Sequence, residues 1–123
     1  MQSLRPPAYL RHNDPEHSDY YFLLGAAGTG VTLHAHNEAW NAVVYGRKRW
    51  FILPRTEMPA LEFPVHHDQQ SWVAEVLPRM GAEDRPMECV QEAGDVLVLP
   101  DAWGHLTYNV RSSIGIAQEF DLQ

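Results

Sequence analysis

Regularly spaced short apolar runs constrain the fold of this chain more than any other feature of its sequence. Eight runs of five to seven residues are rich in Val, Ile, Leu and aromatic side chains, which favour strands, and turn residues separate several of them. The expected strands cover residues 20–24, 30–36, 39–45, 49–53, 87–92, 95–99, 106–110 and 114–120. Turns are expected at 46–47 and 111–113, between successive strands. So many short strands in one chain predict an all-β meander or Greek-key barrel.

Length and composition fit one barrel and exclude several other classes of protein. A chain of 123 residues with 45% hydrophobic residues and four Trp can fill a single core, so residues 1–123 are expected to form one domain. The formal net charge of −7 disfavours a nucleic-acid-binding surface. The one cysteine, Cys89, excludes an internal disulfide framework. No apolar run approaches the roughly 20 residues of a membrane span, and the first residues lack the apolar stretch of a signal peptide.

Residues 55–86 interrupt the strand pattern and are rich in proline. Within this stretch, apolar residues recur at helical spacing over residues 72–80, and Asp68 or Ser71 is the expected N-cap. The stretch therefore predicts a helical insertion that packs over the barrel. The polar, Pro-bearing residues 1–18 are expected to form an extended arm.

Two of the seven histidines lie one residue apart in the second expected strand. Side chains at i and i+2 of a strand project from the same face, about 6 to 7 Å apart, so His34 and His36 can share one ion. Thr32 continues that face. A third imidazole is expected from His105, which follows a turn that contains proline. Three imidazoles at one barrel mouth suit Fe(II), Zn, Mn, Ni or Cu, and the spacing does not choose among them.

The spacing around these histidines resembles the two motifs of the cupin superfamily. The first motif begins G-x5-H-x-H, and its matches are Gly28, His34 and His36. The second reads G-x5-P-x-G-x2-H-x3-N, and its matches are Gly94, Pro100, His105 and Asn109. Two positions depart from these motifs, because Ala102 replaces a glycine and Ala39 replaces a metal-binding glutamate. The resemblance implies a double-stranded β-helix with a metal at its mouth.

A narrower resemblance, over about residues 20–120, is to the JmjC family of iron- and 2-oxoglutarate-dependent oxygenases. The run from Ala39 to Pro54, AWNAVVYGRKRWFILP, carries it, followed by the spacing from Gly94 to Asn109. In that family two histidines and a carboxylate hold Fe(II), 2-oxoglutarate chelates the metal, and a lysine pairs with the far carboxylate of 2-oxoglutarate. The resemblance implies hydroxylation of a C–H bond, with a protein as substrate or partner.

Residue by residue, the resemblance implies a metal site made of His34, His36 and His105. It implies a 2-oxoglutarate site made of Lys48, Asn41, Thr32 and Asn109. His36 stands where the family has its carboxylate. Exchange of a carboxylate for a neutral imidazole raises the charge of the metal and its protein ligands from about +1 to about +2 and softens the ligand set.

The departure at His36 leaves several functions open. The favoured function is a JmjC-type Fe(II)/2-oxoglutarate-dependent oxygenase, a protein hydroxylase. The alternatives are a catalytically attenuated interaction module and a three-His cupin enzyme that does not use 2-oxoglutarate. A shift of the ligand pair to His36 and Glu38 is a further alternative, although it moves Asn41 and Lys48 out of the family spacing.

Each candidate residue also has a purely structural interpretation. The three histidines can be hydrogen-bonded interior residues, and Lys48 can be a solvated residue of the expected 46–47 hairpin. A lysine buried in the barrel without an anion would be costly, so an interior Lys48 would itself indicate a dicarboxylate ligand. The histidines expected in solvent are His12, His17, His66 and His67.

Overall fold

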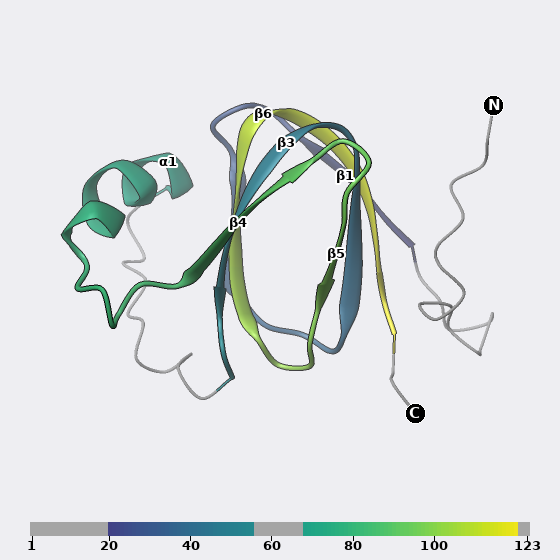
Figure 1. The fold of residues 1–123 in the computed structure, drawn as a ribbon. Coiled ribbons are helices and arrows are strands. Elements are labelled where there is room, and N and C mark those ends of the chain that lie inside the picture. Colours follow the sequence, from purple (N-terminus) through teal and green to yellow (C-terminus); the bar gives the residue numbers. More distant parts are fainter. Residues whose placement is uncertain (1–19, 56–67, 121–123) are drawn as a thin grey trace.

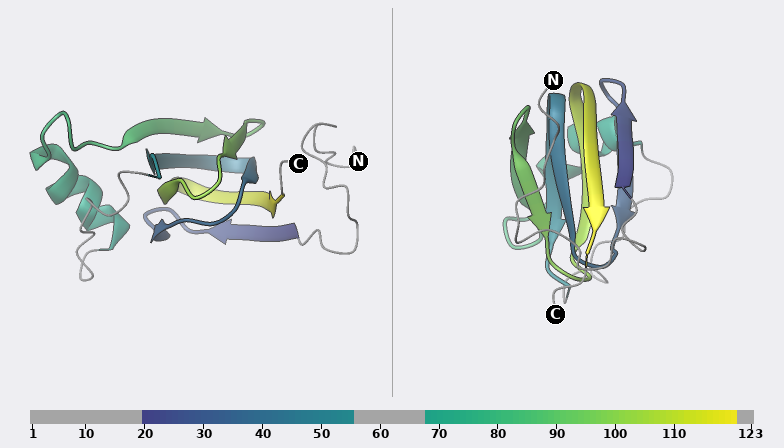
Figure 2. Two further views of the ribbon diagram at one scale, coloured as in Figure 1. Left: turned by 90° about the horizontal axis from the view of Figure 1, so that it is seen from below. Right: turned by 90° about the vertical axis from the view of Figure 1, so that its right-hand side faces the viewer.

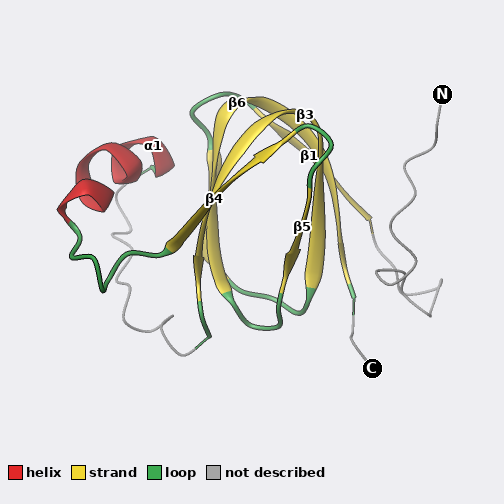
Figure 3. Ribbon diagram, in the orientation of Figure 1, coloured by secondary structure: helices red, strands yellow, loops and turns green. Residues whose placement is uncertain are grey.

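The computed structural model describes residues 20–55 and 68–120 and is an antiparallel β-structure (Figures 1 and 3). Its strands are β1 (Tyr20–Gly25), β2 (Gly30–His34), β3 (Ala39–Leu53), β4 (Met87–Glu92), β5 (Val96–Leu99) and β6 (Gly104–Glu119). They roll into a barrel of the double-stranded β-helix type, which confirms the predicted fold class. The predicted arm and histidines 12, 17, 66 and 67 lie outside the described residues.

Two long strands, β3 and β6, each replace two of the expected strands. The expected turn at 46–47 lies inside β3, and the expected turn at 111–113 lies inside β6. The ladder between the two strands continues past both places, with register shifts between Val43 and Lys48. Gly46 has φ +90°, and a Cβ there would lie 2.1 Å from the Ser112 carbonyl oxygen, so the bend requires glycine. The two turns were wrong predictions, because a bulged bend and a hairpin share the same turn-rich composition.

The bends carry β3 and β6 through both walls of the barrel. In one wall, the first half of β3 pairs with β5 and with the second half of β6, which pairs with β1 (Figure 2, right). In the other wall, the second half of β3 pairs with β4 and with the first half of β6, which pairs with β2. One end of the barrel, here called the mouth, carries loops 35–38 and 100–103, at the bottom of Figure 1. The bends lie at the opposite, closed end.

The insertion forms the predicted helical segment. Helix α1 (Gln69–Ser71) continues into a π-helical turn (Trp72–Val76) and a 3-10 turn (Leu77–Arg79). The Asp68 carboxylate accepts a hydrogen bond from the Ser71 backbone N–H at 2.8 Å, so Asp68 is the N-cap. The segment packs on the outer face of the wall that contains β2 and β4. The buried residues of this contact are Phe51, Trp72, Leu77 and Leu106.

The outer face of the wall that contains β1 and β5 is apolar and more open. Trp40, Ala42 and Phe120 form a buried cluster there, but Phe22 and Leu24 of β1 are exposed. No helix in the described ranges is long and apolar enough to cross a membrane.

Candidate metal centre

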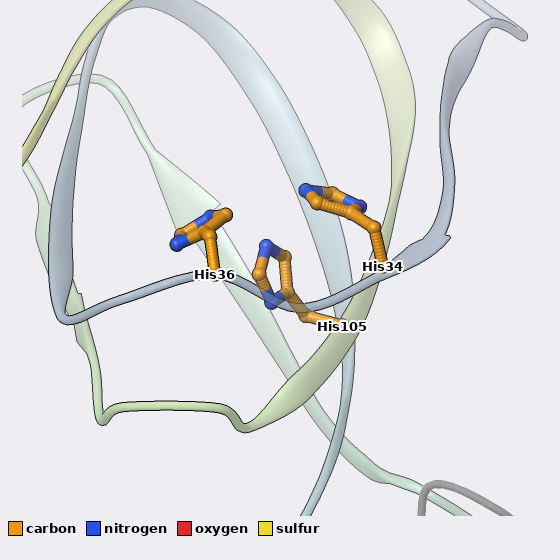
Figure 4. Close-up of side chains that lie close together, drawn as sticks. All are labelled: His34, His36 and His105. Atoms are coloured by element: carbon orange, nitrogen blue, oxygen red, sulfur yellow. The ribbon is translucent and has the colours of Figure 1, made fainter.

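Three histidine rings converge at the mouth of the barrel (Figure 4). His34 ends β2, His36 lies in the following loop, and His105 is the second residue of β6. The centroid of the His105 ring lies 4.2 Å from that of His34 and 4.7 Å from that of His36. One candidate ligand atom from each residue lies within 4.8 Å of the others. The motif spacing predicts this grouping, and the fold places all three side chains within reach of one ion.

A bulge in β2 changes which side chains face the interior. The β2–β6 register shifts between Val31, which pairs with Thr107, and His34, which pairs with His105. Val31 lines the interior pocket, whereas Thr32 is exposed and outside its lining. The expectation that Thr32 shares the histidine face assumed regular alternation, which the bulge breaks.

The three rings share one hydrogen-bonding pattern. The Nδ1 atom of His34 lies 2.7 Å from the Thr32 carbonyl oxygen, and that of His36 lies 2.7 Å from the Asn37 carbonyl oxygen. The Nδ1 atom of His105 lies 3.0 Å from the Trp103 carbonyl oxygen. A carbonyl oxygen only accepts, so in each ring Nδ1 donates and the neutral ring keeps its Nε2 lone pair free. Three imidazole rings that each direct Nδ1 to a carbonyl leave their Nε2 atoms for a first-row divalent metal ion.

Burial favours the neutral, ligating form of His105. Its side chain is 3% exposed, and desolvation lowers its pKa to about 4. The hydrogen bond to the Trp103 carbonyl opposes this shift, while the nearby His34 and His36 add to it. His105 therefore stays unprotonated at neutral pH.

A pocket of about 380 Å³ extends from these histidines into the barrel. Its walls are mostly apolar, and they include Tyr21 of β1, Trp50 of β3 and Thr107 of β6. Sequence reasoning did not single out these three residues as site residues. Strand alternation could have found two of them, because Trp50 is two residues from Lys48 and Thr107 is two residues from His105.

Lys48 lies inside the barrel and lines this pocket. It is the only lysine in the sequence and is 7% exposed. Burial lowers the pKa of its ammonium group. Among the described residues no carboxylate forms an ion pair with it, and Glu119, the one acid in the pocket lining, does not do so. The structure therefore holds a buried cation whose counter-charge is not a described side chain.

Asn41 lies on the pocket wall and is 5% exposed. Its Oδ1 atom is buried and accepts no hydrogen bond within the described structure. Its backbone carbonyl is held by Gln91, whose Nε2 donates to it at 2.8 Å, and Gln91 also accepts from Trp50 Nε1. The Asn41 backbone is thus held beside the pocket, and the buried side-chain oxygen has no described donor.

Two other residues that the sequence suggested for the site, one for 2-oxoglutarate and one as an alternative metal ligand, are not part of the histidine cluster. Asn109 is absent from the pocket lining and joins a network near the closed end, where Ser113 Oγ donates to its Oδ1 at 2.6 Å. Asn109 Nδ2 in turn donates to Thr29 Oγ1 at 3.2 Å. Glu38 is not part of the histidine cluster, so the described structure does not support the alternative ligand pair of His36 and Glu38.

Comparison with known proteins gives concordant results. The family model described as "JmjC domain, hydroxylase" matches residues 21–120. JmjC domain-containing protein 8 of Mus musculus is 38% identical over 112 residues, which are 91% of this chain and 40% of the mouse protein. The Gallus gallus protein named 2-oxoglutarate and iron-dependent oxygenase JMJD4 is 31% identical over 109 residues, 80% of this chain and 25% of that protein.

A solved structure shows the same fold. The ribosomal oxygenase YcfD of Escherichia coli, in complex with cobalt and succinic acid, superposes with a TM-score of 0.57 at 17% identity. The match covers 85% of this chain and 23% of that one. This chain therefore spans less than half the length of each of these proteins.

Proposed function

Because this chain belongs to the JmjC domain family, we propose that it is an Fe(II)- and 2-oxoglutarate-dependent oxygenase that hydroxylates a protein side chain. The observation that carries the proposal is the combination, in one pocket, of three imidazole rings and a buried lysine that has no counter-charge among the described residues. The name of the chicken relative and the cobalt and succinic acid in the YcfD complex support the same cofactor class.

His34, His36 and His105 would hold the metal through their free Nε2 atoms. When bound, the ferrous ion would supply the redox chemistry by which dioxygen hydroxylates a C–H bond while 2-oxoglutarate becomes succinate and carbon dioxide. The backbone carbonyls that accept from each Nδ1 keep the rings in the ligating tautomer. These hydrogen bonds therefore orient the three histidine rings without a bound metal ion.

Lys48 and Asn41 would receive 2-oxoglutarate. An ammonium group in a desolvated pocket is stabilised by an anion, and a dicarboxylate supplies one carboxylate for Lys48 and another for the metal end of the pocket. Asn41 offers an amide at the same wall. The apolar side chains of Tyr21, Leu23 and Trp50 limit water beside the reacting groups.

One specific observation favours a second function, a three-His metal enzyme that does not use 2-oxoglutarate. His36 takes the place of a carboxylate, and its ring lies 4.7 Å from that of His105, within the cluster. Lys48 argues for the first function, because a three-His site without a dicarboxylate leaves this buried lysine without a charge partner among the described residues.

Succinate formation in the presence and absence of added Fe(II) separates these functions. We expect Fe(II)-dependent succinate from the native chain, and loss of it in Lys48→Met but not in the matched variant Arg111→Met at the closed end. Metal binding without succinate would support the second function. No metal uptake at all would leave an interaction module.

Lysine-specific labelling gives an independent test, because Lys48 is the only lysine in the sequence. We expect 2-oxoglutarate to protect Lys48 from an amine-reactive reagent, and glutarate, which keeps both carboxylates but lacks the keto group, to protect it less. Equal labelling with and without 2-oxoglutarate would contradict the assignment of Lys48.

A further inference from the structure

We propose that residues Ala102 and Trp103 of the mouth loop 100–103 are positioning residues that hold two of the three metal ligands at once. This inference rests on the proposed metal site, but not on the use of 2-oxoglutarate. Ala102 acts on the backbone of His36, and Trp103 acts on the ring of His105.

The first contact fixes the loop that carries His36. The Ala102 backbone N–H donates to the His36 carbonyl oxygen at 2.9 Å. His36 lies beyond the end of β2, so no ladder of the sheet holds it. A second backbone anchor of this loop is two residues further on, where the Phe120 N–H donates to the Glu38 carbonyl at 2.8 Å. The Ala102 contact is therefore the backbone bond made by the ligand residue itself.

The second contact comes from the adjacent residue. The Trp103 carbonyl accepts from His105 Nδ1 at 3.0 Å and so fixes the tautomer and the orientation of that ring. Adjacent residues of one short loop thus contact a ligand just beyond the end of β2 and a ligand at the start of β6. The ring centroids of these two ligands, His36 and His105, lie 4.7 Å apart.

The backbone of Ala102 is unusual in a way that serves this arrangement. Its φ is +57°, and it is the one non-glycine residue with a positive φ among those described. This conformation is unfavourable for an L-residue, and it persists only where surrounding contacts hold it. The hydrogen bond to His36 and the hydrophobic strands on either side of the loop supply such contacts. The left-handed turn at Ala102 thus lies between the N–H that binds the His36 carbonyl and the Trp103 carbonyl that accepts from His105.

The expected consequence is a change in metal affinity rather than in fold. Groups that orient metal ligands from outside the coordination shell change metal affinity by roughly 10- to 100-fold when they are removed. Loss of the Ala102 N–H should free the His36 loop while leaving His34 and His105 on their strands. The metal would then be held by two well-placed ligands and one mobile ligand.

The sharpest test replaces the Ala102 peptide N–H by an ester oxygen, which keeps the methyl side chain. Co²⁺ is the probe, its dissociation constant is measured by titration, and its visible absorption reports the coordination. We expect the ester at 102 to weaken Co²⁺ binding by about tenfold or more and to change the spectrum. The matched control is an ester at Ala93, an exposed turn residue at the closed end, which should change the constant by less than about twofold.

A double-mutant comparison separates positioning from a general structural effect. In a His36→Ala background the ester at 102 should have little further effect on the Co²⁺ dissociation constant, because the imidazole that the Ala102 hydrogen bond positions is gone. An equal loss in both backgrounds, or an unchanged constant in the native background, would overturn the proposal. Ala102→Gly changes the same residue but keeps the N–H, so it should keep the affinity for Co²⁺. It therefore tests the donor without relying on the ester variant alone.

The outcome is distinguishable from failure of the proposed function. Absence of Co²⁺ binding in the native chain would remove the metal site and this inference together. Co²⁺ binding without succinate formation would contradict only the proposed oxygenase activity. Co²⁺ binding that is indifferent to the Ala102 N–H would contradict only the positioning role.

Discussion

His34 and His105 are register partners across β2 and β6, and their ring centroids lie 4.2 Å apart. The ladder between two strands therefore fixes these ligands relative to each other, whereas His36 depends on a loop. The sheet holds the backbones of His34 and His105 in place, so neither can shift to compensate when the other is removed. We therefore expect these two histidines to contribute more to metal binding than His36 does. We expect His105→Ala to abolish Co²⁺ binding and His36→Ala to leave a weakened site, as measured by titration with circular dichroism as the control for folding.

The charge of the ligand set gives a prediction about metal preference. A His36→Asp variant replaces a neutral imidazole by a carboxylate, which lowers the charge of the site from about +2 to about +1 and favours harder ions. We expect Mn²⁺ affinity relative to Zn²⁺ to rise by roughly tenfold in competition titrations. An Asn37→Asp variant, one residue away on the exposed loop, serves as the control for added negative charge. An equal rise in both variants would mean that the carboxylate at 36 does not bind the metal.

Burial of Lys48 predicts a conflict between stability and ligand binding. Desolvation lowers the pKa of its ammonium group, so at neutral pH the charged form destabilises the fold unless an anion is present. We expect Lys48→Met to raise the midpoint of thermal unfolding without ligand and to remove the additional stabilisation by 2-oxoglutarate. Arg111→Met should change neither, and a lower midpoint for Lys48→Met would contradict this interpretation of the buried charge.

His105 predicts a loss of stability in mild acid. Its pKa is about 4 in the fold and near its ordinary value of 6.5 in the unfolded chain, so the unfolded state binds the proton first. The free energy of unfolding should fall as the pH drops from about 6.5 toward 4 and level off below that. Denaturant unfolding of metal-free protein at about pH 7 and about pH 5 should show about 1 to 2 kcal/mol less pH dependence in His105→Gln than in the native chain. Identical pH dependence would show that His105 is not the group responsible.

The left-handed backbone at Ala102 predicts a stabilising substitution. Glycine adopts φ +57° without the steric cost that alanine bears there, although it loses more conformational entropy on folding. We expect Ala102→Gly to raise the free energy of unfolding by about 0.5 to 1 kcal/mol, measured by denaturant unfolding. The corresponding change Ala93→Gly, at a residue without positive φ, should lower it.

Sequence reasoning found the elements whose signal is local or lies in motif spacing. The run from Met87 to Glu92 became a strand with the expected bounds, and Asp68 caps the helical segment. The spacing of His34, His36 and His105 identified residues that meet only after the chain has folded.

The errors arose where tertiary structure overrides local pattern. Gly46 has the composition of a hairpin turn, but pairing with β6 on both sides makes it a bend. The bulge after Val31 turned Thr32 away from the interior, and alternation alone cannot reveal a bulge. Asn109 fits a motif by spacing, and its described side-chain hydrogen bonds are to Thr29 and Ser113, so its contact with 2-oxoglutarate stays a prediction.

Because β3 and β6 run through both walls, neither wall can separate from the other without breaking these two strands. Amide hydrogens along their shared ladder should be the slowest in the chain to exchange with deuterium, and those of β1, β2, β4 and β5 should exchange earlier through local opening. Assembly of the barrel must also bring distant stretches of chain together at an early stage, which makes folding slow for a chain of this length.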